Sequence, residues 1–138
     1  HHVMVNIDLP QEMVISGNIS LLYSIFYNLF DNAIKYGGEN IEINLINYLE
    51  DNKFYYLSFA NTGNSIDDTH LQRIFERFYR VDPDRSRESG GTGLGLSIVK
   101  QIISAHGEQI HVESTKGRGT RFWFELPYAP EAEPAEVD

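Results

Sequence analysis

Hydrophobic and polar residues repeat along the chain with two different periods. A period of two predicts five strands, over residues 3–9, 41–45, 54–61, 110–114 and 120–126. A helical period predicts a long helix that follows Gly17-Asn18, ends at about Tyr36 and is stopped by Gly37-Gly38. The chain therefore combines helices with strands.

The long helix carries two stripes of different character. Its apolar stripe consists of Leu22, Ile25, Phe26, Leu29 and Ala33. Asn28, Asn32 and Lys35 form a second stripe beside it, with Tyr36 at its edge. Two asparagines one turn apart, bordering the core stripe, favour a pocket wall. The alternative is a solvated face, which would be expected to carry mixed charges.

A second helix is predicted directly after a glycine-rich run, in which four glycines fall within residues 90–95. Its apolar face is predicted to be Leu94, Ile98, Ile102 and Ala105. A helix that begins inside such a run directs unpaired N–H groups and its positive dipole end at one spot, which suits an anion. A flexible loop before an ordinary helix is the alternative.

The strand over residues 54–61 ends in a polar residue on its apolar side. Tyr55, Leu57 and Phe59 share a face, and a period of two places Asn61 on that face, next to Thr62-Gly63. Such an amide either caps a turn or contacts a ligand.

The segment between Gly63 and Gly90 is polar and holds the densest group of basic residues in the chain. Its length and composition are typical of a lid over a site. A solvated surface helix is the alternative, but it leaves Phe75 and Phe78 unexplained. The basic residues are Arg73, Arg77, Arg80, Arg85 and Arg87.

Composition limits the classes of function. The 138 residues suit one domain, and the absence of cysteine excludes disulfides and thiolate metal sites. A net charge of −9 argues against nucleic acid as a partner.

We expect a domain over residues 1–127 and an acidic disordered tail over 128–138. No stretch approaches the ~18 apolar residues of a membrane span. We therefore expect a cytoplasmic fragment without direct membrane contact, from a protein that could be anchored in the inner membrane.

Taken in order, four blocks resemble the catalytic and ATP-binding domain of sensor histidine kinases, within the group that includes gyrase, heat-shock chaperones and mismatch-repair ATPases. Residues 28–36 resemble the asparagine box, 61–66 the first glycine box, 75–80 the phenylalanine box and 91–96 the second glycine box. Residues 117–120 resemble the late Gly-x-Gly-Thr. The phenylalanine box favours histidine kinases over the other members.

The resemblance implies an α/β (α+β) two-layer sandwich, with a mixed, mainly antiparallel sheet, helices on one face and an ATP lid. It implies ATP and Mg²⁺ as cofactors, with Asn28 and Asn32 as metal ligands. Lys35 and Arg80 would act with them as catalytic residues on the phosphates. The positions that it assigns to nucleotide binding are Tyr36, Asn61, Gly63, Ile66, Arg77, Gly91, Thr92, Gly93, Leu94, Gly95, Leu96 and Thr120.

The implied reaction is transfer of the γ-phosphoryl group of ATP to a histidine on a dimerisation domain, with a response regulator receiver domain as a further partner. No segment here resembles that phosphoacceptor helix, so the chain is expected to be a fragment or to act in trans. The family usually has Asp at the position of Asn61, and glycine at that of Ser65. These departures keep open a non-catalytic nucleotide-binding or interaction module. A gyrase-like ATPase is disfavoured, because Asn28 stands where such enzymes carry an acid.

Overall fold

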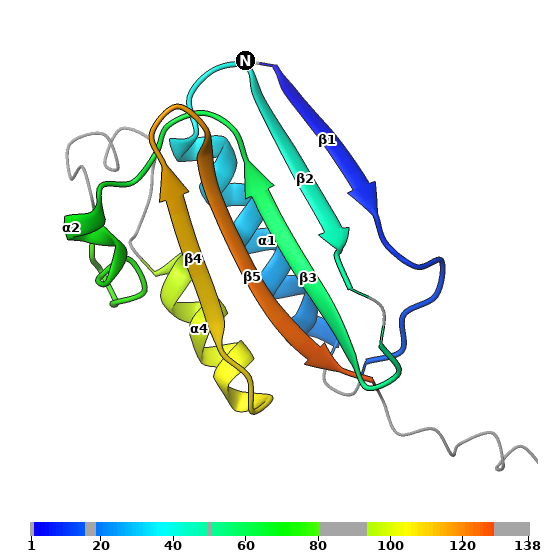
Figure 1. The fold of residues 1–138 in the computed structure, drawn as a ribbon. Helices are drawn as coiled ribbons and strands as arrows, with labels where there is room; N and C mark the ends of the chain where they lie inside the picture. Colours follow the sequence, from blue (N-terminus) through cyan, green and yellow to red (C-terminus); the bar gives the residue numbers. More distant parts are fainter. Residues whose placement is uncertain (1, 16–18, 50, 81–93, 129–138) are drawn as a thin grey trace, which may run out of the picture.

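The computed structural model describes residues 2–15, 19–49, 51–80 and 94–128, which form one sheet with helices packed on one of its faces (Figure 1). The strands within these residues are β1 (Val3–Asp8), β2 (Ile41–Asn47), β3 (Phe54–Asn61), β4 (Ile110–Thr115) and β5 (Gly119–Pro127). The helices are α1 (Ile19–Tyr36), α2 (Asp68–Leu71) and α4 (Gly95–Ala105).

The sheet is mixed and mainly antiparallel, as predicted. Its strand order is β1-β2-β3-β5-β4, and only the β1–β2 pair is parallel. Parallel neighbours need a long crossover, and the β1–β2 crossover contains α1. In the β2–β3 and β4–β5 pairs, the two strands are consecutive elements of the chain. This topology brings the end of β3 beside the start of β5.

The core lies between α1, α4 and the face of the sheet that they cover. On α1 the predicted stripe faces inward, with Ile25, Leu29 and Ala33 buried. On β3 and β5 every second residue is buried, which confirms the predicted faces. Phe30 meets Phe59 edge to face, with 4.9 Å between ring centroids. These contacts fix α1 over the central strands.

The predicted apolar face of α4 is correct at Ile102 but wrong at Ile98 and Ala105. Its buried residues are Val99, Ile102 and Ile103, whereas Ala105 is exposed and Ile98 is 37 % exposed. At about 100° per residue, the centre of the observed face is rotated by about 100° around the helix from the centre of the predicted one. Ile102 lies at the edge that the two faces share.

β1 is an edge strand whose side chains are all exposed. Val5 and Ile7 pair in register with Ile43 and Leu45 of β2, which are buried. Val5 is 43 % exposed and Ile7 is 60 % exposed. The alternation of the sequence therefore predicted a strand here correctly, but the apolar residues of that strand are not buried.

Tyr128, the first residue of the predicted tail, is joined to the sheet. Its ring stacks on Tyr55 at 4.3 Å, its N–H donates to the carbonyl of Lys53, and it forms a bridge with Ile15. Residues 129–138 lie outside the described residues. Among the described helices, none has the length and hydrophobicity that crossing a membrane requires.

Candidate functional site

The end of α1 and the end of β3 are joined by a close backbone contact. Gly63 has a φ of +109°, and a β-carbon placed on it would lie 2.1 Å from the carbonyl oxygen of Gly37. Asn64 reinforces the contact, because its N–H donates to Gly37 O at 2.8 Å and its Nδ2 donates to Tyr36 O at 3.0 Å. Only glycine fits at position 63, so the first glycine box is fixed against the asparagine helix.

The start of β5 packs equally closely on the end of β3. Gly119 has a φ of +126°, and a β-carbon placed on it would lie 2.0 Å from the carbonyl oxygen of Asn61. The next residue, Thr120, is the register partner of Asn61. The two side chains are 6 % and 7 % exposed, so they form a buried polar pair within an otherwise apolar face.

Hydrogen bonds fix both members of this pair. Nδ2 of Asn61 donates to the carbonyl oxygen of Thr62 at 2.8 Å. Oγ1 of Thr120 lies 2.9 Å from Oγ of Ser114, which also accepts from the N–H of Ile66 at 2.7 Å. The Asn61 bond uses the amide nitrogen and is not the turn cap in which the side-chain oxygen accepts.

Asn28 connects α1 with the first turn of α4. Its Nδ2 donates to the carbonyl oxygen of Ser24 at 2.8 Å, and its Oδ1 lies 3.0 Å from where a β-carbon on Gly95 would be. Asn28 and Asn32 are both half-buried. Lys35 forms an ion pair with Asp31, with 3.2 Å between Nζ and Oδ2. Within the asparagine stripe, Asn28 is thus the residue that the structure places beside α4.

Of the glycine-rich run over residues 90–95, the structure describes only Leu94 and Gly95. Leu94 is the N-cap of α4, and Gly95 is the first residue of the helix. Leu96 is half-buried against the core. The helix start thus lies beside Asn28, where the sequence places an anion site. The predicted residues Gly91, Thr92 and Gly93, and the arginines at 85 and 87, lie outside the described residues.

The lid segment before residue 81 is partly anchored to the core. Ile74 is buried, and Phe75 meets Phe122 edge to face at 6.1 Å. Phe78 is 61 % exposed at a φ of +66°. Phe75 therefore has a packing role that the sequence did not reveal, whereas Phe78 remains on the surface.

The two arginines assigned to phosphate binding come from the same segment. Arg77 is exposed, and its guanidinium lies 5.2 Å from the ring centre of Phe78. Arg80 is half-buried. The short helix α2 before them has Asp67 as its N-cap, and the Asp67 carboxylate accepts from the N–H of Thr69. This bond holds the pKa of Asp67 below its usual value of 3.8.

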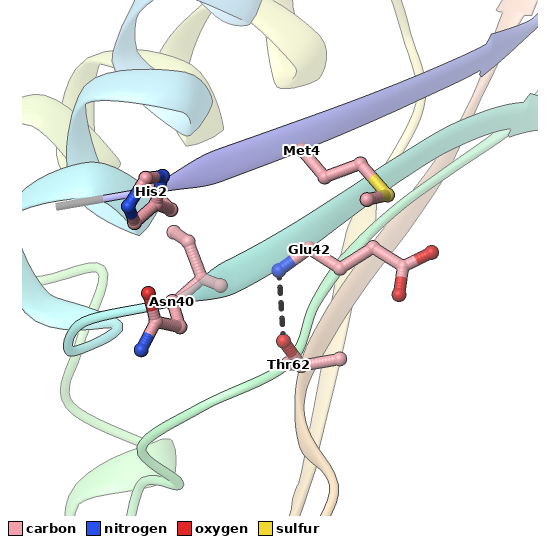
Figure 2. A pocket seen from close by; sticks show the side chains of 6 residues that line it. His2, Met4, Asn40, Glu42 and Thr62 are labelled. Carbon is pink, nitrogen blue, oxygen red and sulfur yellow. Dashed lines mark hydrogen bonds between the residues drawn. The ribbon is translucent and has the colours of Figure 1, made fainter.

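A pocket of about 260 Å³ lies away from these residues, at the start of β1 and β2. Figure 2 shows its lining, in which the N–H of Glu42 donates to Oγ1 of Thr62 at 2.8 Å. None of the predicted site residues lines it. Its walls are His2, Met4, Asn40, Ile41, Glu42 and Thr62.

Sequence reasoning missed Ser114 and Asn64 as residues that shape the site. Ser114 ends the strand predicted over residues 110–114, and its Oγ accepts from the N–H of Ile66, 48 residues away in the chain. Only the β4–β5 register brings it to Thr120. The period of two and the following Gly-x-Gly-Thr turn were the signals that could have found it.

The donor set of the α1 stripe fits Mg²⁺. This hard cation prefers oxygen ligands, retains several waters and takes further oxygens from substrate phosphates, so it needs few protein ligands. The bond from Nδ2 to Ser24 leaves Oδ1 of Asn28 as the atom directed toward α4. Within the described residues, no group of three or more His, Cys, Asp or Glu side chains is arranged to hold a metal.

Comparison with known proteins identifies relatives of this arrangement. The family described as "Histidine kinase-, DNA gyrase B-, and HSP90-like ATPase" matches residues 17–130. The sensor histidine kinase WalK of Bacillus subtilis is 41 % identical over 107 residues, which cover 77 % of this chain and 18 % of WalK. The phosphate regulon sensor protein PhoR of Pseudomonas aeruginosa is 39 % identical over 118 residues, covering 86 % of this chain and 26 % of PhoR.

Solved structures agree with the fold. The mycobacterial sensor histidine kinase MprB has a TM-score of 0.76 at 29 % identity, covering 93 % of this chain and 83 % of the MprB chain. Full-length ShkA in complex with AMPPNP has a TM-score of 0.71 at 29 % identity, covering 96 % of this chain and 27 % of ShkA. The chain therefore spans only about a fifth to a quarter of the curated relatives named above.

Proposed function

Because this chain belongs to the family of histidine kinase-, DNA gyrase B- and HSP90-like ATPases, as a catalytic ATP-binding domain of the sensor histidine kinase type, we propose that it binds Mg-ATP and transfers the γ-phosphoryl group to a histidine. That histidine would lie on a separate dimerisation domain of the same protein, and a response regulator receiver domain would take the phosphoryl group from it. The reaction would occur in the cytoplasm. The observation that carries the proposal is the contact of Asn28 with the first turn of α4.

This contact supports a triphosphate site between the two helices. The amide oxygens of Asn28 and Asn32 would hold Mg²⁺, which when bound neutralises phosphate charge. The N-terminal N–H groups of α4, which begins at Gly95, would donate to phosphate oxygens. Lys35 would exchange its half-exposed ion pair with Asp31 for a phosphate, because a pair near the surface contributes little stability.

The second half of the nucleotide would lie toward the end of β3. Asn61 and Thr120 form the only pair of adjacent buried polar side chains on the β3–β5 interface among the described residues, which suits a base edge. Gly63 and Ile66 would line the approach, and Tyr36 would flank the sugar or base. Leu94 and Leu96 would add apolar contacts.

Arg77 and Arg80 would supply positive charge to the γ-phosphate. Phosphoryl transfer depends mainly on positioning and on stabilisation of charge on the transferred group. Arg80 is half-buried at the end of the described lid segment, so it needs less ordering than exposed Arg77. Gly91, Thr92 and Gly93 are proposed as backbone donors from the sequence pattern alone.

Transfer of label tests the proposal. The chain is mixed with its helical histidine domain and with ATP labelled at the γ-position, and label on that domain is measured. We expect transfer from the unaltered chain and from Asn52→Ala, a control in an exposed turn, and a loss of at least tenfold for Asn32→Ala. Absence of label on the helical domain, while an intact control kinase labels its own, would refute the kinase function.

A non-catalytic nucleotide-binding module is the second candidate, because Asn61 offers a neutral amide where the family usually has a carboxylate. A neutral hydrogen bond is weaker than a charge-assisted one by about 1 kcal/mol. This candidate predicts nucleotide binding without transfer to any helical domain. Transfer of label above would exclude it.

A further inference from the structure

The outer edge of β1 presents backbone groups that could bond to a further strand. β1 is the last strand of the sheet on its side, and Figure 1 shows α1 and α4 behind other strands, away from β1. The carbonyl oxygen of His2 accepts from the N–H of Ile41 on β2 at 3.1 Å. Because backbone groups alternate in direction along a strand, the even-numbered residues of β1 bond toward β2. The odd-numbered residues Val3, Val5 and Ile7 therefore direct their N–H and C=O groups at the open edge.

The same three residues carry aliphatic side chains that remain exposed. Each is the register partner of a buried residue of β2, so its side chain lies on the face of the sheet that carries the core. Val3, Val5 and Ile7 are nevertheless 39 %, 43 % and 60 % exposed. Edge strands are commonly protected from pairing by lysine or proline, whereas the only charged residue of β1 is Asp8 at its end. The edge is thus both apolar and unprotected.

The sequence along this edge is complementary to itself. If two copies of β1 run antiparallel with Val5 opposite Val5, then Val3 lies opposite Ile7, and aliphatic residues meet only aliphatic residues on the core side. On the other face, the same register places His2 opposite Asp8, a basic side chain opposite a carboxylate. A two-fold contact requires this reciprocity, in which residue i meets residue j and residue j meets residue i. The pattern therefore favours a second copy over an unrelated strand.

We propose that the edge of β1 pairs with β1 of a second copy of this chain, as an antiparallel pair centred on Val5 that joins the two sheets into one. Each facing pair of odd-numbered residues exchanges two backbone hydrogen bonds. Two six-residue strands bury less than the about 1,600 Å² of a standard interface, so the dissociation constant should be about 0.1–1 mM. The inference is independent of the proposed nucleotide site, to which no residue of β1 is assigned.

Disulfide trapping tests the register, because the chain has no cysteine of its own. In Val5→Cys the two new thiols lie opposite each other, with about 5.5 Å between Cα atoms, a distance that a disulfide spans. Val3→Cys is the matched control on the same face, and its two thiols lie about 13 Å apart along the strands. We expect Val5→Cys to form a covalent dimer at least tenfold faster than Val3→Cys under a mild oxidant, measured on a non-reducing gel.

Val5→Pro separates loss of pairing from loss of the fold. The N–H of Val5 points to the open edge, so proline removes a donor to the second copy and none to β2. In sedimentation at about 1 mM, we expect a mixture of monomer and dimer for the unaltered chain and monomer alone for Val5→Pro, with the same ATP affinity in both. Val5→Lys places two like charges opposite each other and should also abolish the dimer, which serves if Val5→Pro does not fold.

Three results would overturn the proposal. Equal trapping rates in Val5→Cys and Val3→Cys, or no disulfide in either, would exclude the two-fold register and leave the edge to a strand of another protein. An unaltered chain that remains monomeric at about 1 mM would exclude the dimer itself. A dimer that persists in folded Val5→Pro or Val5→Lys would place the contact elsewhere on the surface. All three would leave the proposed binding of ATP standing.

Discussion

Gly117 in the β4–β5 turn and Gly119 at the start of β5 provide a matched pair for testing how the site is held together. Gly117 and Gly119 both have left-handed φ values, +86° and +126°. A β-carbon on Gly117 would meet nothing within 4 Å, whereas one on Gly119 would lie 2.0 Å from Asn61 O and 2.8 Å from Thr62 Cα. Alanine at the two positions therefore differs mainly by a collision with the end of β3.

The free energies of unfolding should differ accordingly. Gly117→Ala should lower the free energy of unfolding by about 1–2 kcal/mol, because alanine must adopt a left-handed backbone. Gly119→Ala has a comparable backbone cost and must also displace backbone atoms, and overpacking of this kind costs about 1–3 kcal/mol more. The atoms that must move belong to Asn61 and Thr62, so nucleotide affinity should fall along with stability.

Urea denaturation and ATP titration of the two variants measure both effects. We expect Gly119→Ala to lose about 2–5 kcal/mol of stability, and its ATP affinity to fall at least tenfold, under conditions where it remains folded. Gly117→Ala should bind ATP as the unaltered chain does. Equal stability and equal ATP affinity in the two variants would refute the close packing of β5 on Asn61.

Three further predictions concern the rest of the domain. Leu29→Ala should cost about 2–5 kcal/mol in urea denaturation because Leu29 is fully buried, whereas Ile34→Ala on the exposed side of α1 should cost under about 0.5 kcal/mol; similar losses would contradict the assigned core face. Asp67→Ala should lower stability at pH 7, and this difference should vanish as the pH falls through the pKa of folded Asp67, which lies below 3.8; a difference that persists in acid would contradict the capping role. Truncation before Tyr128 should lower the thermal midpoint by a few degrees, because a stacked ring is lost, whereas truncation after it should not.

Local pattern determined much of the fold. The alternation on β3 correctly placed Tyr55, Leu57, Phe59 and Asn61 on one buried face. The glycines at 37 and 38 correctly marked the end of α1. Such features depend on the period of one element and on its own stop signals, which neighbouring residues carry.

Features that depend on distant segments could not be predicted in the same way. The exposure of β1 follows from its place at the sheet edge, and the buried face of α4 follows from how that helix is rotated on the sheet. The hydrogen bonds of Ser114 with Thr120 and Ile66 join segments that only the folded chain brings together. The sequence nominated Asn61 and Thr120, but it contained no information about their hydrogen-bond partners.

The central claim is that the asparagine stripe of α1 and the start of α4 form a Mg-ATP site. Calorimetric titration of the chain with ATP, with Mg²⁺ and with excess chelator, tests it most directly. The account predicts that removal of Mg²⁺ weakens ATP binding at least tenfold, and that Asn28→Ala loses most of this dependence on Mg²⁺ while Asn52→Ala retains it. ATP binding that is the same with and without Mg²⁺, or that is absent in both, would contradict the account.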